Sequence, residues 1–147
     1  MGGATLLLTH AECKGHSAGP GHPESAERMQ AVLEALAPEY FPDLVRRDAP
    51  LAEAADVAVA HDPDYVNAIL AAVPPAGRVA IDGDTAMSPG SGIAALRAAG
   101  AMTAAVDAVL DGEAANAFCV VRPPGHHAER ARAMGFCLFN NVAIGAM

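Results

Sequence analysis

The chain has 147 residues, of which 52% are hydrophobic, so we expect an ordered globular domain rather than a disordered segment. A formal net charge of -8 argues against nonspecific binding to nucleic acid or to an anionic membrane, since such partners attract patches of Lys and Arg. Three scattered cysteines are too few for a disulfide framework, which favours a reducing cytoplasm.

Neither a leader nor a membrane span is predicted. Met1–His10 contains only a short apolar stretch with no basic residue before it, unlike a secretory signal. No uninterrupted apolar run approaches the ~18 residues that a bilayer span needs. We therefore expect a soluble protein.

The first half of the chain alternates strands and helices. The β-branched and aliphatic run Thr5–Thr9 predicts a strand that leads into a loop rich in Gly and His. From Glu24 the apolar residues recur at helical spacing, with Pro23 at the expected first position and Pro38 marking the end. Leu44–Arg47 suggests a second strand, and Leu51–Ala60 predicts another helix.

The second half continues the alternation. Asp62-Pro63 predicts a cap and first turn for a helix that stops at Pro74-Pro75. Ser88-Pro89 is interpreted in the same way, as the cap of an Ala-rich helix that runs through Leu110 and stops at Asp111-Gly112. The run Ala117–Val121 is typical of a strand buried on both faces of a parallel sheet. Asn140 or Asn141 is expected to cap one more helix.

These elements predict an α/β fold with a parallel sheet. Such a sheet needs helices on both faces, and the two or three strands found here are few for that architecture. We therefore interpret residues 1–147 as one interrupted domain, without internal repeats.

The segment from Arg122 to Asn141 carries the candidate chemistry. Pro123-Pro124 forces an extended exit from the preceding strand, and Gly125 allows a tight turn, which presents His126 and His127 beyond the carboxyl end of that strand. Two neighbouring imidazoles suit hydrolysis, because one can take a proton while the other stabilises an oxyanion. From the dipeptide alone, two solvated loop histidines are the favoured alternative.

The surrounding residues resemble a known family. The motifs RPPGHHA and GFCLFNN, separated by a short spacer, are similar to the tandem-histidine signature of histone deacetylases and acetylpolyamine amidohydrolases. Upstream, GHPESAER and DGDTAMSPGS also resemble segments of that family, so the likeness spans nearly the whole chain and is closest to its bacterial and class II members. It implies a three-layer arginase/deacetylase fold and zinc-dependent hydrolysis of acetylated lysine side chains or acetylpolyamines.

The resemblance also implies residue roles at the centre of the site. His127 would act as general base and then as general acid, while His126 would mainly stabilise the tetrahedral intermediate. The carbonyl of Gly135 would accept the amide N–H of the substrate. Phe136 would form a wall of the narrow tunnel that holds the lysine stem; core packing is the alternative for this side chain.

Two further positions stay open. Asp84 matches the rim aspartate that grips the substrate backbone, with Asp82 as a near alternative, and both could instead be turn-forming aspartates. Arg28 matches an arginine near the inner end of the pocket, or it is a helix residue in solvent. The histidines and cysteine of the first loop are interpreted as part of a specificity loop rather than as a second zinc site.

The family's zinc ligands lie in a segment of the form Asp-x-Asp-x-His-His, which is absent from these 147 residues, as is its carbonyl-polarising tyrosine. A catalytic zinc needs three protein ligands, so we expect no deacetylase activity from this chain alone. The alternative is a naturally short protein that binds a partner without catalysis, with its open sheet edge covered by another chain.

Overall fold

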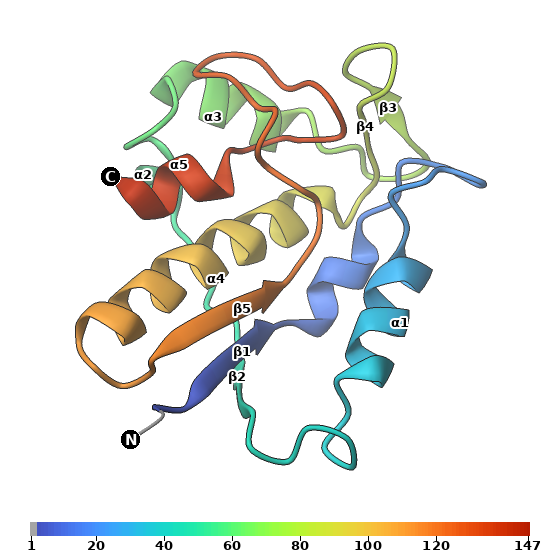
Figure 1. Cartoon of the computed structure of the whole chain (residues 1–147). Coiled ribbons are helices and arrows are strands. Elements are labelled where there is room, and N and C mark those ends of the chain that lie inside the picture. Colours follow the sequence, from blue (N-terminus) through green and yellow to red (C-terminus); the bar gives the residue numbers. More distant parts are fainter. Residues whose placement is uncertain (1–2) are drawn as a thin grey trace.

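The centre of the fold is a parallel sheet of three strands in the order β2-β1-β5 (Figure 1). The computed structural model describes residues 3–147, so the first two residues of the Met1–His10 segment lie outside it. Strand β1 (Thr5–Thr9) pairs with β2 (Val45–Asp48) on one side and with β5 (Asn116–Val120) on the other. The predicted α/β class with a parallel sheet is confirmed.

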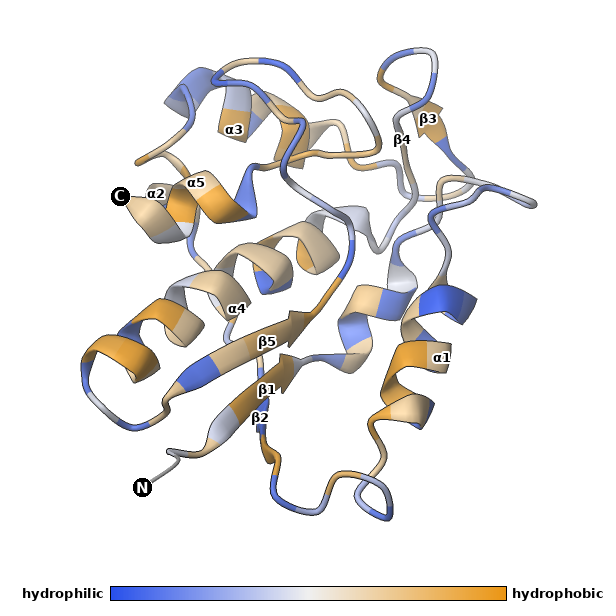
Figure 2. Ribbon diagram, viewed as in Figure 1, coloured by the Kyte–Doolittle hydropathy of each residue, from blue (hydrophilic) through white to orange (hydrophobic). Residues whose placement is uncertain are grey.

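Two helices cover the two faces of this sheet. Leu6 and Leu8 pack with alanines of α4 (Ser91–Leu110), whereas Leu7 packs with residues of α1 (Ala26–Ala35) on the opposite face. The faces alternate because successive side chains of a strand point in opposite directions. Figure 2 shows β1, most of β5 and α4 as apolar, whereas β2 is largely hydrophilic.

Helix α4 is the central support of the molecule. Its many buried alanines allow close packing, and at Gly100 an added Cβ would overlap the carbonyl of Pro50. The helix ends at Asp111-Gly112 as predicted, with Gly112 in the left-handed conformation that closes many helices. By length and composition α4 is also long and apolar enough to cross a membrane. Its buried side lies against the sheet, as in the core helix of a globular protein.

A second core lies where the short helices α2 (Ala54–Val57), α3 (Pro63–Ala71) and α5 (Asn141–Ala146) meet α4. Asp62 caps α3 as predicted, and Asn140 rather than Asn141 caps α5 by accepting the N–H of Ala143. A hairpin of β3 (Val79–Ala80) and β4 (Ala86–Met87) borders this core. The large buried side chains here are Val57, Val66, Ile69, Met87, Leu138, Phe139 and Ile144.

Two predicted helix starts were wrong. Helix α1 begins at Ala26 and not at Pro23, because the Ser25 hydroxyl caps it by accepting the N–H of Arg28. Likewise α4 begins at Ser91, two residues after the Ser88-Pro89 pair. Ser88 is not available as a cap, since its hydroxyl binds the carbonyl of Gly15 and the N–H of Ser17.

Two other predictions need correction. The helix expected over Leu51–Ala60 is reduced to the four residues of α2. The strand expected to be buried on both faces is instead an edge strand of the described chain, and Phe118 on it is 51% exposed. A continuous apolar run indicates that a strand can be buried on both faces, but tertiary packing decides which elements cover those faces.

A buried ion pair joins the two loops that follow β1 and β5. Arg122 is 3% exposed, and its Nε and Nη2 donate to the two carboxylate oxygens of Glu24 at 2.6 and 2.8 Å. Its Nη1 donates to the carbonyls of Cys13 and His16 at 3.0 and 2.8 Å. His16 in turn lies 3.4 Å from Glu24 and 2.7 Å from the hydroxyl of Ser91. The first loop is thereby fixed against both β5 and α4.

We predict that Glu24→Gln destabilises the fold by about 3–5 kcal/mol, because it leaves the buried guanidinium without its counter-charge. Urea denaturation monitored by circular dichroism measures this change. Glu27→Gln is the matched control, since Glu27 is exposed on the first turn of α1. Equal stability of the two variants would contradict the assigned role of the pair.

The same pair predicts a pH dependence. Burial raises the pKa of Glu24, but the hydrogen bonds and charges of His16 and Arg122 outweigh it and lower the pKa from 4.5 to about 2. A carboxyl with a depressed pKa stabilises the fold fully above its unfolded value. The stabilisation should therefore be lost as the pH falls from 4.5 towards 2, and Glu24→Gln should lack this part of the acid transition.

Candidate active site

The two candidate histidines lie on the loop that follows β5. Pro123 and Gly125 are buried, whereas His126 and His127 are exposed, with their ring centroids 4.2 Å apart. The position beyond the carboxyl end of a parallel strand agrees with the sequence prediction. The structure thus places the two imidazoles next to each other on a loop whose first residues are buried.

The loop is held by the segment that leads into α5. The side chain of Asn140 donates to the carbonyl of Ala128 at 3.0 Å, and that of Asn141 donates to the carbonyl of Pro123 at 3.5 Å. A Cβ at Gly125 would overlap the carbonyl oxygen of Phe139, which explains the glycine before the histidines. The NN pair of GFCLFNN therefore fixes the base of the histidine loop.

His61 is a structural residue that the sequence analysis did not identify. It is 1% exposed, its Nδ1 contacts the carbonyl of Arg130 at 3.2 Å, and its Nε2 accepts the N–H of Asn140 at 2.8 Å. Burial lowers the pKa of His61, so the neutral ring with a proton on Nδ1 satisfies both partners. Its only signal in the sequence is its place before the Asp62-Pro63 cap, and its partners are far away along the chain.

Gly135 and Phe136 form a tight turn beside the histidines. Met134 and Cys137 pair as an antiparallel bridge, with backbone hydrogen bonds of 3.1 and 2.9 Å. The two residues between them have φ angles of 58° and 70°, as in a two-residue turn of type I′. A Cβ at Gly135 would lie 2.8 Å from the ring of His127. The glycine thus provides both the backbone conformation and the space for the imidazole.

The structure distinguishes the two candidate rim aspartates. Asp82 accepts the backbone N–H groups of Asp84 and Thr85, which makes it the aspartate of a local turn. The hydrogen bond from the Asp84 amide holds the pKa of Asp82 below its usual value. Asp84 instead reaches across to accept the N–H of Gly135 at 3.2 Å. Of the two aspartates, only Asp84 is hydrogen-bonded to the turn that lies against His127.

An open cavity of about 470 Å³ connects these residues, with Asp82, Asp84, His127, Met134 and Gly135 in its lining. The ring of Phe136 meets the ring of His22 edge-on, with 4.5 Å between centroids. His22 comes from the first loop, so the site combines three segments that are distant in the sequence. Burial raises the pKa of the neighbouring Cys137, whose thiol contacts the carbonyl of Gly135 at 3.3 Å.

Arg28 lies apart from this cavity. It is exposed on α1, where it donates to the carbonyl of Pro23 at 3.4 Å. It lines a separate cavity of about 220 Å³, together with Met29 and residues 118–122. Within residues 3–147 the structure therefore does not bring Arg28 to the tandem histidines, and its role in a pocket stays a prediction.

The His and Cys residues of the first loop do not converge. His10 caps a short 3-10 helix, Cys13 is buried under the sheet, His16 binds Ser91, and His22 contacts Phe136. Across residues 3–147, no group of three or more His, Cys, Asp or Glu side chains could hold a metal ion. The residues present thus do not by themselves fit a zinc site.

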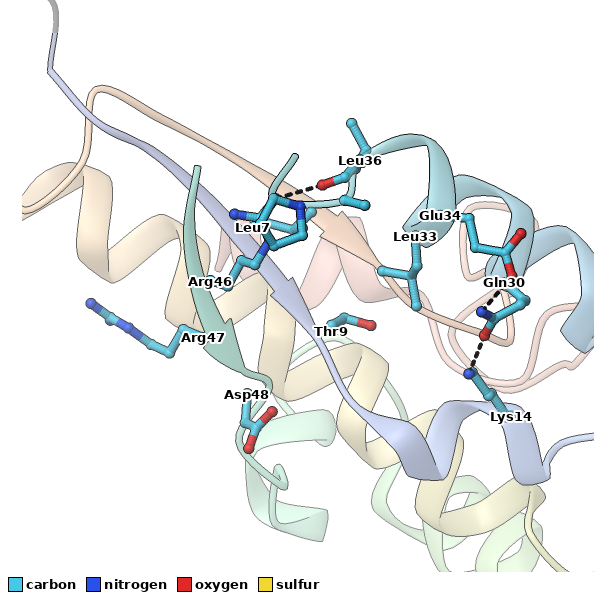
Figure 3. A pocket seen from close by; sticks show the side chains of 12 residues that line it. Leu7, Thr9, Lys14, Gln30, Leu33, Glu34, Leu36, Arg46, Arg47 and Asp48 are labelled. Carbon is cyan, nitrogen blue, oxygen red and sulfur yellow. Dashed lines mark hydrogen bonds between the residues drawn. The ribbon is translucent and has the colours of Figure 1, made fainter. Parts of the chain in front are cut away.

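The largest cavity that we describe lies elsewhere, between α1 and the edge strand β2 (Figure 3). Its volume is about 590 Å³, and Leu7 and Leu33 contribute its apolar floor. Arg46 on β2 donates to the carbonyls of Leu36, Phe41 and Leu44, so its charge is engaged within the protein. This cavity holds no candidate catalytic group.

The chain matches a family model, the "Histone deacetylase domain", over residues 22–147. It is 36% identical over 143 residues to a "Probable deacetylase" of Archaeoglobus fulgidus, covering 95% of this chain and 39% of that protein. It is also 39% identical over 130 residues to a "Histone deacetylase-like amidohydrolase" of Pseudomonas aeruginosa, covering 86% of this chain and 33% of that protein.

Among solved structures, the "HDA15 HD domain" matches with a TM-score of 0.87 and 30% sequence identity. The match covers 98% of this chain and 42% of that structure. The chain thus spans less than half the length of these relatives.

We predict that Gly135→Ala displaces the ring of His127. The left-handed backbone makes the alanine unfavourable by about 1–3 kcal/mol. In addition, the exposed imidazole must move away from the new Cβ. Urea denaturation measures the first effect, and the His127 imidazole signals in an NMR spectrum measure the second.

Gly77→Ala separates the two effects. Gly77 also has a positive φ of 67°, but a Cβ there would meet none of the described atoms within 4 Å. Its stability loss should be similar to that of the first variant, with the His127 signals unchanged. Unshifted His127 signals in Gly135→Ala would contradict the close approach.

Proposed function

The chain belongs to the histone deacetylase family, and on that premise we propose that the whole protein hydrolyses acyl amides, removing acetyl groups from lysine side chains or from acetylpolyamines. The observation that carries the proposal is that the rings of His126 and His127 lie side by side, with 4.2 Å between their centroids. His127 lines a cavity together with Gly135 and Asp84. Relatives named as deacetylases and as an amidohydrolase support this class of reaction.

The geometry supports a division of work between the two imidazoles. His127 lines the cavity, and its ring rests on Gly135, so its nitrogen can exchange a proton with a water or a leaving amine held there. The adjacent ring of His126 can stabilise negative charge on the tetrahedral carbon's oxygen. We assign general base and then general acid catalysis to His127, and stabilisation of the intermediate to His126.

We propose that the reaction is zinc-dependent and that the zinc ligands come from outside residues 1–147. Three protein ligands are needed for a catalytic zinc, and residues 3–147 provide no such group. It follows that this chain by itself should be inactive. The three cysteines in the described chain are free, which supports a reducing compartment such as the cytoplasm.

The proposed substrates suit both the charge and the shape of the site. A net charge of -8 favours basic ligands, such as lysine-containing peptides and polyamines. Phe136, next to Gly135, offers an apolar ring for an aliphatic stem, and Asp82 and Asp84 add negative charge to the cavity that His127 and Gly135 line. Rim carboxylates and an apolar wall fit a cationic substrate with an uncharged acyl end.

We predict that the zinc-loaded whole protein releases acetate from an acetyl-lysine peptide or from an acetylated polyamine. His127→Ala should lower kcat by ~10²–10⁴-fold, as expected for loss of a general base. His126→Ala should lower kcat by roughly 10²–10³-fold through loss of oxyanion stabilisation. His10→Ala is the matched control and should keep full activity, because the His10 side chain caps a 3-10 helix and is not among the described residues that line the cavity. Full activity of the chelator-treated protein would exclude zinc dependence.

A separate prediction concerns the isolated chain. Purified residues 1–147 with added zinc should show no turnover of either substrate, because the metal ligands are missing. Acetate release measured by an enzyme-coupled assay tests this. Turnover that is lost in the His127→Ala form of the same chain would overturn the requirement for residues outside it.

A further inference from the structure

The Asp84-Thr85 pair binds both amides at the tip of the Gly135–Phe136 turn. Asp84 Oδ1 accepts the N–H of Gly135 at 3.2 Å, and Thr85 Oγ1 accepts the N–H of Phe136 at 3.1 Å. The hydroxyl of Thr85 donates to Asp84 Oδ1 at 2.9 Å. The three bonds join the rim loop to a turn that is about 50 residues later in the sequence.

This turn needs external support because of its backbone conformation. Phe136 has a φ of 70°, and it is the sole non-glycine residue with a positive φ in the described chain. The left-handed region is unfavourable for a bulky side chain and persists where neighbouring groups hold it. The bridge between Met134 and Cys137 closes the turn, but it leaves the two tip amides to find other acceptors. Asp84 and Thr85 are those acceptors.

Thr85 is itself rigidly placed. Its side chain is 1% exposed, its N–H donates to Asp82 Oδ1 at 2.8 Å, and its carbonyl accepts the N–H of Ile81 at 2.8 Å. A hydroxyl has a single proton. Because that proton is directed to Asp84, the oxygen can meet the Phe136 amide as an acceptor. The side chain of Thr85 therefore fixes the positions of both the Asp84 carboxylate and the Phe136 backbone.

We propose that Thr85 is a positioning residue, which holds the rim carboxylate of Asp84 and the ring of Phe136 in one fixed arrangement beside His127. The inference deepens the proposed function and rests on it. His22 of the first loop contacts the ring of Phe136, so both the side chain and the backbone N–H of Phe136 are held in place. Thr85 touches no substrate in this scheme and acts through Asp84 and Phe136.

A first experiment tests the clamp without any catalysis, in residues 1–147. In Thr85→Val the shape of the side chain is kept but the acceptor is lost, so hydrogen exchange of the Phe136 amide should become roughly tenfold faster. Thr85→Ser restores the hydroxyl and should retain slow exchange. Thr103→Val is the matched control, since the Thr103 hydroxyl donates to Ala99 on α4. Thr85→Ala serves in place of Thr85→Val if the latter does not fold.

A second experiment uses the zinc-loaded whole protein and an acetyl-lysine peptide. Thr85→Val should lower kcat/KM roughly tenfold, the loss expected for a displaced hydrogen-bonded group, and Thr85→Ser should restore it. Equal loss in the Ser and Val variants would indicate packing alone and would overturn the proposal. So would unchanged exchange of the Phe136 amide in Thr85→Val. Wild-type protein without turnover would refute the proposed function, while the exchange result would still decide the clamp.

Discussion

The buried ion pair of Arg122 and Glu24 is the constraint on which the candidate site depends. Arg122 directly precedes the turn that carries the histidines, and Glu24 directly follows the His22-Pro23 segment of the first loop. Four hydrogen bonds from one guanidinium fix these two loops to each other. Removing both charges from water is unfavourable, so the pair stabilises one specific arrangement only because nearly every polar atom is satisfied.

That arrangement brings His22 to Phe136, and a second set of polar contacts completes the wall of the site. Within the Asp82–Thr85 segment, the carboxylate of Asp82 closes a local turn. The side chains of Asp84 and Thr85 then bind the Gly135–Phe136 turn, in which both residues are left-handed. Apolar packing places the loops only approximately, because the hydrophobic effect is not directional. Charge-assisted and backbone hydrogen bonds then determine where the histidines, the aromatic ring and the carboxylate lie.

The chain covers less than half of the length of the relatives that it matches. The described residues include the two histidines to which we assign proton transfer in the proposed function, and they provide no cluster of metal ligands. The matched relatives are more than twice as long as the region they share with this chain. Strand β5, which carries the half-exposed Phe118, forms an edge of the described sheet directly before the histidine loop. In the function proposed above, metal binding would therefore need residues other than those described.

The sequence by itself determined the α/β class with a parallel sheet, the Asp62 cap of α3, the C-terminal end of α4, and the family through its tandem histidines. These follow from local periodicity, capping residues and turn residues, which neighbours in the chain control. Tertiary structure decided the rest. It distinguished Asp84 from Asp82, moved the start of α4 to Ser91, and left Arg28 on the surface. It also identified His61 and Thr85, because a buried hydrogen-bond partner can lie 50 or more residues away, beyond the reach of any local pattern.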